Sequence, residues 1–413
     1  MADVKIVSVE AVRRFRFERQ SLDGSAAEAP VVGDAPILDY GVQDTGPDGA
    51  AWALLIRGAD VPAADLVYAW TLRGAPHAYR RADIAAIAVA TAPLSEADAG
   101  KRIFDAMKPL KAAGIPALDA LRTLAGHQRT IVRSATVKGE VSSRLTQLVD
   151  EPYLRSCKPC NAIHVYENPF RMAALQAALE LERGTSPPVL RRITGLKPPM
   201  YRRLGVEAEP RFDVVRNYVR FFGPARIRDA AAYLDAPQAD VERQWPADVV
   251  EVTVEGEAAP APASTSSGRG SSGRGSSGRG SSSSSSGRAR RRFVLAEDAE
   301  ALAEAGAGRG TTASASVRLL GPFDPYLQLR DRELLAPEPE RRKALWPILG
   351  RPGAVVRGGE VLALWRPRTS GKRLRLAVEP WRSLRAADRR TLEEDAERLA
   401  AFRDVMLAGL DFD

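Results

Sequence analysis

A tract of serine, glycine and arginine, Ser264–Gly287, interrupts this chain of 413 residues. Such residues bury almost no apolar surface, so they add nothing to a core, and we predict a disordered insert over 258–292. The folded part must then come from the two flanking segments, 1–257 and 293–413. At roughly 100–200 residues per domain, these segments have room for two to four units.

The insert also carries most of the excess positive charge. The net charge is +8, and 258–292 contains seven arginines and no acidic residue, which leaves about +1 for the rest. Arg269, Arg274 and Arg279 are candidates for contacts with DNA phosphates. The alternative is a tolerated loop insertion far from any ligand. Net charge therefore does not by itself identify the folded part as DNA-binding.

Several classes of protein are excluded by what the sequence lacks. The apolar runs are too short for a membrane span, and Met1–Arg19 contains no apolar stretch typical of a signal peptide. We therefore predict a cytoplasmic protein without a membrane partner. No heptad seam indicates a dimer, so we expect a monomer.

Three short helices followed by a strand are predicted just before the insert. Apolar spacing favours helices over 211–222, 225–234 and 238–245, and 249–254 is typical of a strand. This is the order of a winged helix, with the second wing strand returning at 292–295. We assign the module to 186–257. Its third helix would present Gln238 and Arg243 to DNA.

A second module is predicted over 96–185, and a first over 1–95. In the second, 137–149 has the pattern of a helix that presents Lys138, Ser142 and Arg144 to phosphates and base edges. A merely solvated helical face remains the alternative. No strict sequence period proves the repetition.

The C-terminal segment, 293–413, differs in pattern. Short β-type runs occur at 317–320, 327–329, 354–357, 361–365 and 374–378, and an amphipathic helix covers 386–407. We predict a β-barrel-like domain closed by this helix. The fold class is α+β, mostly helical, with tandem winged-helix modules before the β-domain.

Several strings together resemble one family, the AlkZ/YcaQ-like DNA glycosylases. The resemblance covers nearly the whole chain outside the insert, and the strings that carry it are Gly41–Pro47 (GVQDTGP), Trp70–His77 (WTLRGAPH), Phe222–Ala225 (FGPA), Leu319–Tyr326 (LLGPFDPY) and Gly359–Trp365 (GEVLALW). It implies three winged helices and a C-terminal β-domain around double-stranded DNA. It also implies monofunctional hydrolysis of N-glycosidic bonds to alkylated or crosslinked bases, without a cofactor, at the nucleoid.

The family's catalytic motif is only partly present. The motif reads Gln-apolar-Gln or Gln-apolar-Asp, whereas this chain has Gln43-Asp44-Thr45. A slip of one residue would align Asp44 with the acidic branch but replace the first Gln by Val42. Either way one member is missing, so a non-catalytic DNA-binding or regulatory protein remains the alternative function.

The three motif residues can still support hydrolysis. A cationic alkylated base leaves easily, so the enzyme needs mainly a positioned water and electrostatic support for the sugar. The Gln43 amide can hold water and a sugar or phosphate oxygen, Asp44 can stabilise positive charge, and Thr45 can bind water. The alternative is an ordinary turn, because 44–49 is rich in turn-forming residues.

Three further residues are candidates for DNA contacts. Arg57 and Arg73 suit phosphates, although surface arginines often have no such role. His77 follows the Arg-Gly pair of its string and could line the DNA cleft; a structural histidine is the alternative.

Cys157, Cys160 and His164 have spacing that supplies three zinc ligands, with Glu167 as a candidate fourth. Because no second cysteine pair exists, we interpret the cysteines as two reduced thiols and assign no metal.

Overall fold

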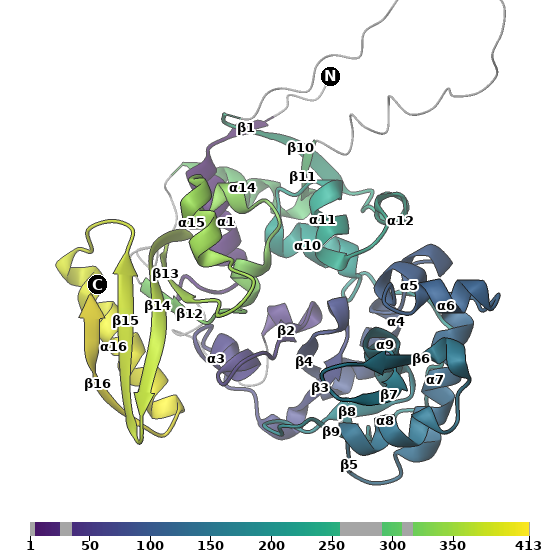
Figure 1. The fold of residues 1–413 in the computed structure, drawn as a ribbon. Helices are drawn as coiled ribbons and strands as arrows, with labels where there is room; N and C mark the ends of the chain where they lie inside the picture. Colours follow the sequence, from purple (N-terminus) through teal and green to yellow (C-terminus); the bar gives the residue numbers. More distant parts are fainter. Residues whose placement is uncertain (1–4, 25–34, 257–290, 308–316, 413) are drawn as a thin grey trace, which may run out of the picture.

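The computed structural model describes residues 5–24, 35–256, 291–307 and 317–412 (Figure 1). Most of the predicted insert, with Arg269, Arg274 and Arg279, lies outside the described residues. Arg291 and Arg292 are described: Arg291 pairs with Glu251, and Arg292 is a buried residue of a strand. None of the described helices combines the length and apolar character needed to cross a membrane.

The unit before the insert has the predicted order of elements. It consists of α10 (Val214–Phe222), α11 (Ile227–Leu234), α12 (Gln238–Arg243), β10 (Val249–Val254) and β11 (Arg292–Leu295). Asp213 caps α10 by accepting hydrogen bonds from the backbone N–H groups of Val215 and Arg216. Strands β10 and β11 pair antiparallel, so 292–295 returns beside 249–254 as predicted.

The N-terminal segment joins this unit rather than the residues that follow it. Strand β1 (Lys5–Val7) pairs in parallel with β10, which gives a sheet in the order β1-β10-β11. Helix α1 (Val9–Arg19) packs against α14 (Ala299–Gly306) and α10. Residues 5–19 of the predicted first module therefore contact the unit before the insert, and the module bounds 1–95 stay a prediction.

A six-stranded sheet lies in the middle of the molecule. Its order is β2-β4-β3-β8-β9-β5, and its strands are β2 (Val42–Gln43), β3 (Leu66–Trp70), β4 (Pro76–Arg80), β5 (Thr136–Val137), β8 (Leu179–Leu181) and β9 (Val189–Arg192). The sheet crosses the predicted module boundaries at 95/96 and 185/186. Helix α3 (Gly49–Leu55) follows β2.

Short helices accompany this sheet. They are α4 (Ile84–Ala90), α5 (Glu96–Arg102), α6 (Met107–Ala112), α7 (Ala117–Ile131), α8 (Lys138–Thr146) and α9 (Glu167–Gln176). Between α8 and α9, strands β6 (Leu154–Cys157) and β7 (Ala162–Val165) form a separate two-stranded hairpin. Helix α8 is the predicted DNA-facing helix, and it packs against β7.

The C-terminal segment forms an open sheet. Its order is β12-β13-β14-β15-β16, and its strands are β12 (Val317–Leu320), β13 (Gly353–Arg357), β14 (Glu360–Ser370), β15 (Arg373–Pro380) and β16 (Met406–Phe412). Within the described residues β12 and β16 are opposite edges, so the barrel-like prediction is not confirmed. Helix α16 (Ala386–Phe402) packs on both edge strands.

Two details of the C-terminal prediction are wrong. The run at 327–329 is not a strand, because the 3₁₀ helix η9 (Pro325–Gln328) occupies most of it. The terminal helix stops at Phe402, and the last described residues form β16, which pairs in parallel with β15.

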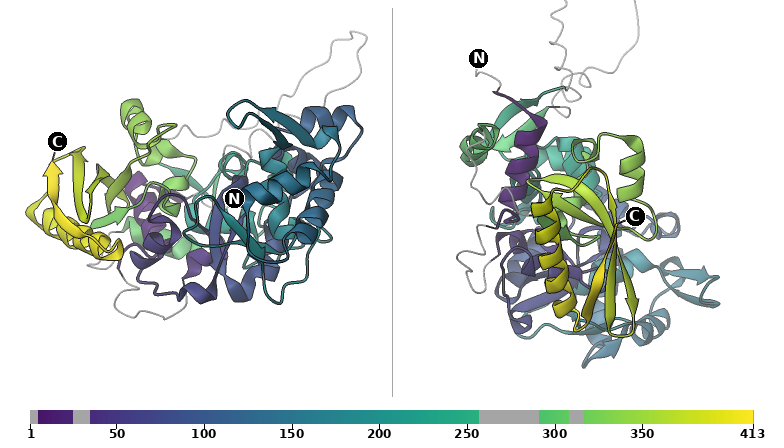
Figure 2. Two further views of the ribbon diagram at one scale, coloured as in Figure 1. Left: turned by 60° about the horizontal axis from the view of Figure 1, so that its bottom comes forward. Right: turned by 90° about the vertical axis from the view of Figure 1, so that its left-hand side faces the viewer.

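Helix α15 (Pro339–Leu345) lies between β12 and β13 in the chain. Figures 1 and 2 show the C-terminal sheet and helices α5–α9 at opposite ends, with α3 between them.

Buried ion pairs join segments that are distant in sequence. The Asp331 carboxylate accepts from Arg16 of α1 at 2.7 Å and from Arg292 of β11 at 2.6 Å. Arg57 donates to both oxygens of Asp324 at 2.8 Å. All five side chains are buried. The C-terminal segment is thereby fixed to the N-terminal helix and to the loop after α3.

Candidate active site

Gln43 lies at the end of β2, where the strand pairs with Ala78 and His77 of β4. Its side-chain amide is held at both ends. The Nε2 atom donates to Thr45 Oγ1 at 3.0 Å, and the Oε1 atom accepts from Arg73 Nη2 at 3.3 Å. The side chain is half-buried. A half-exposed amide with this fixed orientation can present its remaining hydrogen-bonding positions to a ligand.

Arg73 connects the Gln43 loop to a third segment. It lies in the turn between β3 and β4, with a left-handed φ of 56°. Its guanidinium lies over the Tyr233 ring of α11, with CZ 4.2 Å from the centroid, and Nη1 donates to the Tyr233 carbonyl at 2.8 Å. The sequence prediction placed Arg73 at the DNA surface, and the structure places it beside Gln43.

Asp44 holds the start of helix α3. Its Oδ1 atom accepts a hydrogen bond of 2.9 Å from the Ala50 backbone N–H, and burial raises the pKa of its carboxyl group, opposed by that hydrogen bond and by Arg183. A Cβ at Gly49, where φ is 44°, would lie 2.0 Å from Asp44 Oδ1. The close fit requires glycine there. One oxygen of Asp44 is therefore committed to a structural contact.

His77 is brought to the site but lies beneath its surface. The ring is 1% exposed, and Nδ1 lies 3.0 Å from the Ala75 carbonyl and 3.1 Å from Thr71 Oγ1. Burial, with a smaller contribution from Arg73, lowers the pKa of His77 to about 3. The ring is therefore neutral at physiological pH and is not a cationic phosphate contact. Within the described part of the chain, its buried Nε2 has no hydrogen-bond partner.

Three arginines near Arg73 were missed by the sequence prediction. Arg330, Arg332 and Arg351 have half-buried side chains without a carboxylate partner among the described residues. Burial, then the charges of Arg330 and Arg351, lower the pKa of Arg332 to about 10. Burial and Arg73 also lower the pKa of Arg330. We call these three residues together with Arg73 the arginine cluster. The four side chains form an unneutralised positive region typical of an anion site.

One member of the arginine cluster, Arg351, lines a cavity that Thr45 of the motif also lines. The cavity has a volume of about 450 Å³ and is lined by Thr45, Asp48, Phe323 and Arg351, among others. Arg351 also lies over the Phe323 ring, with CZ 4.8 Å from the centroid. Thr45 is the motif residue that lines this cavity, together with Gly321–Asp324 of the family string. Arg330 and Arg332 lie a few residues after the end of that string at Tyr326, and this proximity is the signal that could have identified them.

Arg57 is buried in its ion pair with Asp324, so it is not available for the predicted phosphate contact. This burial is not visible in the sequence, because Asp324 is distant in the chain. The arginine instead attaches the C-terminal segment to the loop that follows α3.

The residues of α8 that were predicted to contact DNA form a second group. Lys138 binds Glu167, Arg144 pairs with Glu140, and Ser142 lines a cavity beside the β6–β7 hairpin. Arg171 donates to Glu167 at 2.6 Å and to the Gly74 carbonyl at 3.2 Å. Glu167 and Arg171 thereby connect α8 to the turn that contains Arg73.

The candidates on α12 form a third group. Gln238 and Arg243 are both exposed, and Arg243 pairs with Asp240 of the same helix. Among the described residues, neither side chain forms a hydrogen bond or an ion pair with the motif loop. Their role at DNA stays a prediction.

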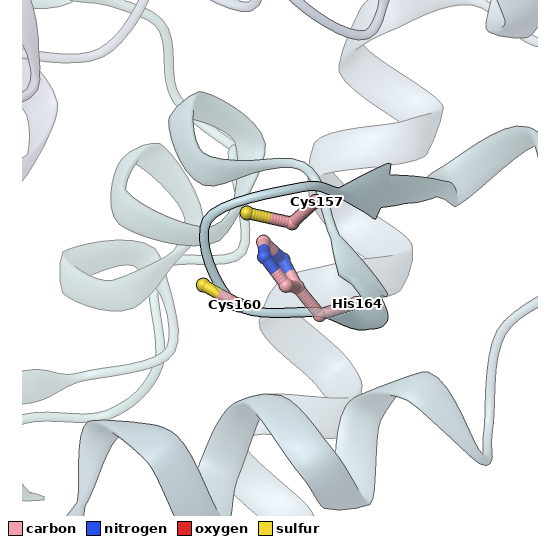
Figure 3. A group of neighbouring side chains, drawn as sticks. All are labelled: Cys157, Cys160 and His164. Carbon is pink, nitrogen blue, oxygen red and sulfur yellow. The ribbon is translucent and has the colours of Figure 1, made fainter.

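Among the described residues, one group of side chains has the composition and spacing of a metal site. The Sγ atoms of Cys157 and Cys160 and a ring nitrogen of His164 all lie within 4.8 Å of one another on the β6–β7 hairpin (Figure 3). Glu167, the candidate fourth ligand, is instead held by Lys138 and Arg171.

Comparison with known proteins agrees with the strings and the fold. A family model described as DNA glycosylase AlkZ-like matches residues 40–402. Among solved structures, Streptomyces sahachiroi DNA glycosylase AlkZ is similar, with a TM-score of 0.63 and 20% identity over 98% of this chain and 99% of that one. None of the curated proteins matches. The family match covers most of the sequence, and the chain therefore belongs to the AlkZ-like family of DNA glycosylases.

Proposed function

We propose that this protein is a monofunctional DNA glycosylase that removes alkylated or crosslinked bases from double-stranded DNA, with Gln43 at the reaction centre. The observation that carries the proposal is the Gln43 amide, fixed by Arg73 and Thr45 at the edge of the arginine cluster. A positioned amide and an adjacent positive region can bind water, sugar and phosphate at one place.

The proposed chemistry needs few catalytic side chains, because an alkylated base is already a good leaving group. Gln43 would position the water that attacks C1′, and Thr45 would fix the orientation of the amide. The arginine cluster would grip the phosphates that flank the damaged nucleotide. Asp44 would act as a positioning residue through its contact with Ala50.

We assign the surrounding helices to DNA binding in the same proposal. Helices α10–α12 with β10 and β11 would form one winged helix, with Gln238 and Arg243 on its recognition helix. Helix α8 would present Ser142 and Arg144, with the β6–β7 hairpin as a second wing. The protein would act as a monomer.

The test is release of 7-methylguanine from an oligonucleotide duplex under single-turnover conditions. We expect release by the wild type, a loss of about 10²–10³-fold for Gln43→Ala, and a smaller loss for Thr45→Ala. Unchanged duplex affinity and circular dichroism would assign these losses to chemistry. A duplex with an interstrand crosslink, tested in parallel, would separate the two classes of lesion.

A non-catalytic DNA-binding protein is the second candidate. It is favoured by Thr45, which stands where the family has Gln or Asp, and by the use of Asp44 Oδ1 to hold α3. Tight duplex binding without base release from either lesion would select this candidate and reject the glycosylase.

A further inference from the structure

The β6–β7 hairpin has little that stabilises its tip. It forms a two-stranded sheet of its own, and residues 158–163 at the tip are exposed, including Ile163 at 63%. An isolated hairpin is only marginally stable in water. Cys157 ends β6, Cys160 lies in the turn, and His164 lies on β7, so the three side chains span the tip. In Figure 3 both sulfur atoms and the ring lie on one side of the hairpin.

A backbone contact fixes the tautomer of the His164 ring. His164 Nδ1 lies 2.7 Å from the Val165 carbonyl oxygen, so the N–H is at Nδ1 and donates to that carbonyl. The lone pair is then at Nε2. Metal-binding histidines commonly donate their second ring nitrogen to a backbone carbonyl in this way, which fixes both tautomer and orientation.

The surroundings also favour a thiolate. Arg155 Nη2 lies 3.7 Å from Cys157 Sγ. A thiolate is the form of cysteine that binds metal, and the nearby guanidinium favours negative charge at the Cys157 sulfur.

We propose that Cys157, Cys160 and His164 bind one zinc ion, with solvent in a fourth position that opens to the cavity beside α8. Two thiolates and an imidazole are donors that suit zinc. The cavity, of about 860 Å³, is lined by all three residues and by Lys138 and Ser142 of α8. Glu167 also lines it, but its carboxylate is bound by Lys138 and Arg171, so it is not a ligand.

Bound zinc would cross-link the two strands at the hairpin tip, and β7 packs on α8. The ion would therefore have a structural role at a surface proposed to meet DNA. The inference does not depend on glycosylase activity, and metal binding can be measured without any base-release assay.

The experiment uses the full chain, purified under reducing conditions without a histidine tag. Elemental analysis should give about one zinc per chain. After chelation, titration with Co²⁺ should produce thiolate-to-cobalt charge-transfer absorption that saturates at one equivalent. The chain has only two cysteines, so this absorption reports Cys157 and Cys160 alone. Chelation should also lower the melting temperature.

Single substitutions distinguish the proposed zinc ligands from other residues. Cys160→Ser, whose side chain is exposed, should remove the charge-transfer band and the zinc while the chain stays folded. His164→Ala should weaken zinc binding at least about tenfold, whereas His127→Ala, on α7, should have no effect. Wild-type protein that holds no zinc and shows no charge-transfer band with Co²⁺ would overturn the proposal. Retention of zinc by Cys160→Ser would overturn it equally.

Discussion

Arg73 donates a hydrogen bond of 3.3 Å from Nη2 to Oε1 of Gln43, while its Nη1 binds the carbonyl of Tyr233. This one guanidinium contacts β2 and α11, which are far apart in the chain. Two of the family strings, around Gln43 and Arg73, therefore meet at a single point. The proposed reaction centre depends on this contact.

The first prediction concerns Arg73→Lys. Lysine keeps the positive charge but lacks the planar fork that stacks on Tyr233 and donates to two acceptors. We expect duplex affinity to change by only a few fold and the single-turnover rate of base release to fall by about 10²-fold. An unchanged rate, or a loss confined to affinity, would contradict the assigned orienting role of Arg73.

The second prediction separates the two possible roles of Asp44. Asp44→Asn keeps an oxygen that can accept from the Ala50 N–H, so we expect near-native stability and most of the activity. Asp44→Ala removes the acceptor and should lower the free energy of unfolding by about 1 kcal/mol. Urea unfolding and base release measure the two effects. Full stability with abolished activity in Asp44→Asn would instead make the carboxylate catalytic.

The third prediction concerns the arginine cluster. Because burial and Arg330 and Arg351 lower the pKa of Arg332, Arg332→Ala relieves repulsion and should leave stability unchanged or slightly raised. It should weaken duplex binding and reduce the slope of log K against log salt by about 0.9 if one phosphate contact is lost. Fluorescence anisotropy at several salt concentrations measures both quantities.

The matched control for Arg332 is Arg122→Ala, which removes an exposed arginine of α7 that pairs with Asp119. It should leave affinity and slope unchanged. Equal slopes for both variants would show that Arg332 does not contact phosphate.

The fourth prediction concerns Asp331, buried between Arg16 and Arg292. The two arginines overcome the effect of burial and hold the pKa of this carboxyl well below its usual range. Asp331→Asn removes the negative charge that Arg16 and Arg292 share, so we expect a loss of about 3–5 kcal/mol in the free energy of unfolding at pH 7.

The same ion pairs set a pH dependence. Because the folded-state pKa is lowered, the contribution of Asp331 is present above the unfolded pKa of about 3.9 and is lost as the pH falls below it. The difference between wild type and Asp331→Asn should therefore be constant from pH 7 to 5 and shrink toward pH 3. Asp404→Asn, which breaks an exposed pair with Lys372, is the control and should have a much smaller effect. A difference that grows on acidification would contradict the assignment.

Local patterns determined the elements of the unit before the insert. Helices α10–α12 and strand β10 lie within a few residues of the predicted ranges, because apolar spacing and the breaks at Gly223-Pro224 and Pro237 act over short distances. The family strings likewise located Gln43 and Arg73 without a structure. Neither kind of pattern shows which segments will meet.

Only the tertiary structure decided how the segments assemble. The pairings of β1 with β10 and of β15 with β16 join distant or unpredicted strands, and the burial of Arg57 depends on Asp324, far along the chain. Arg330, Arg332 and Arg351 became a candidate site because their folded positions bring like charges together near Arg73. Periodicity is a property of neighbouring residues, whereas desolvation and charge proximity are properties of positions in space.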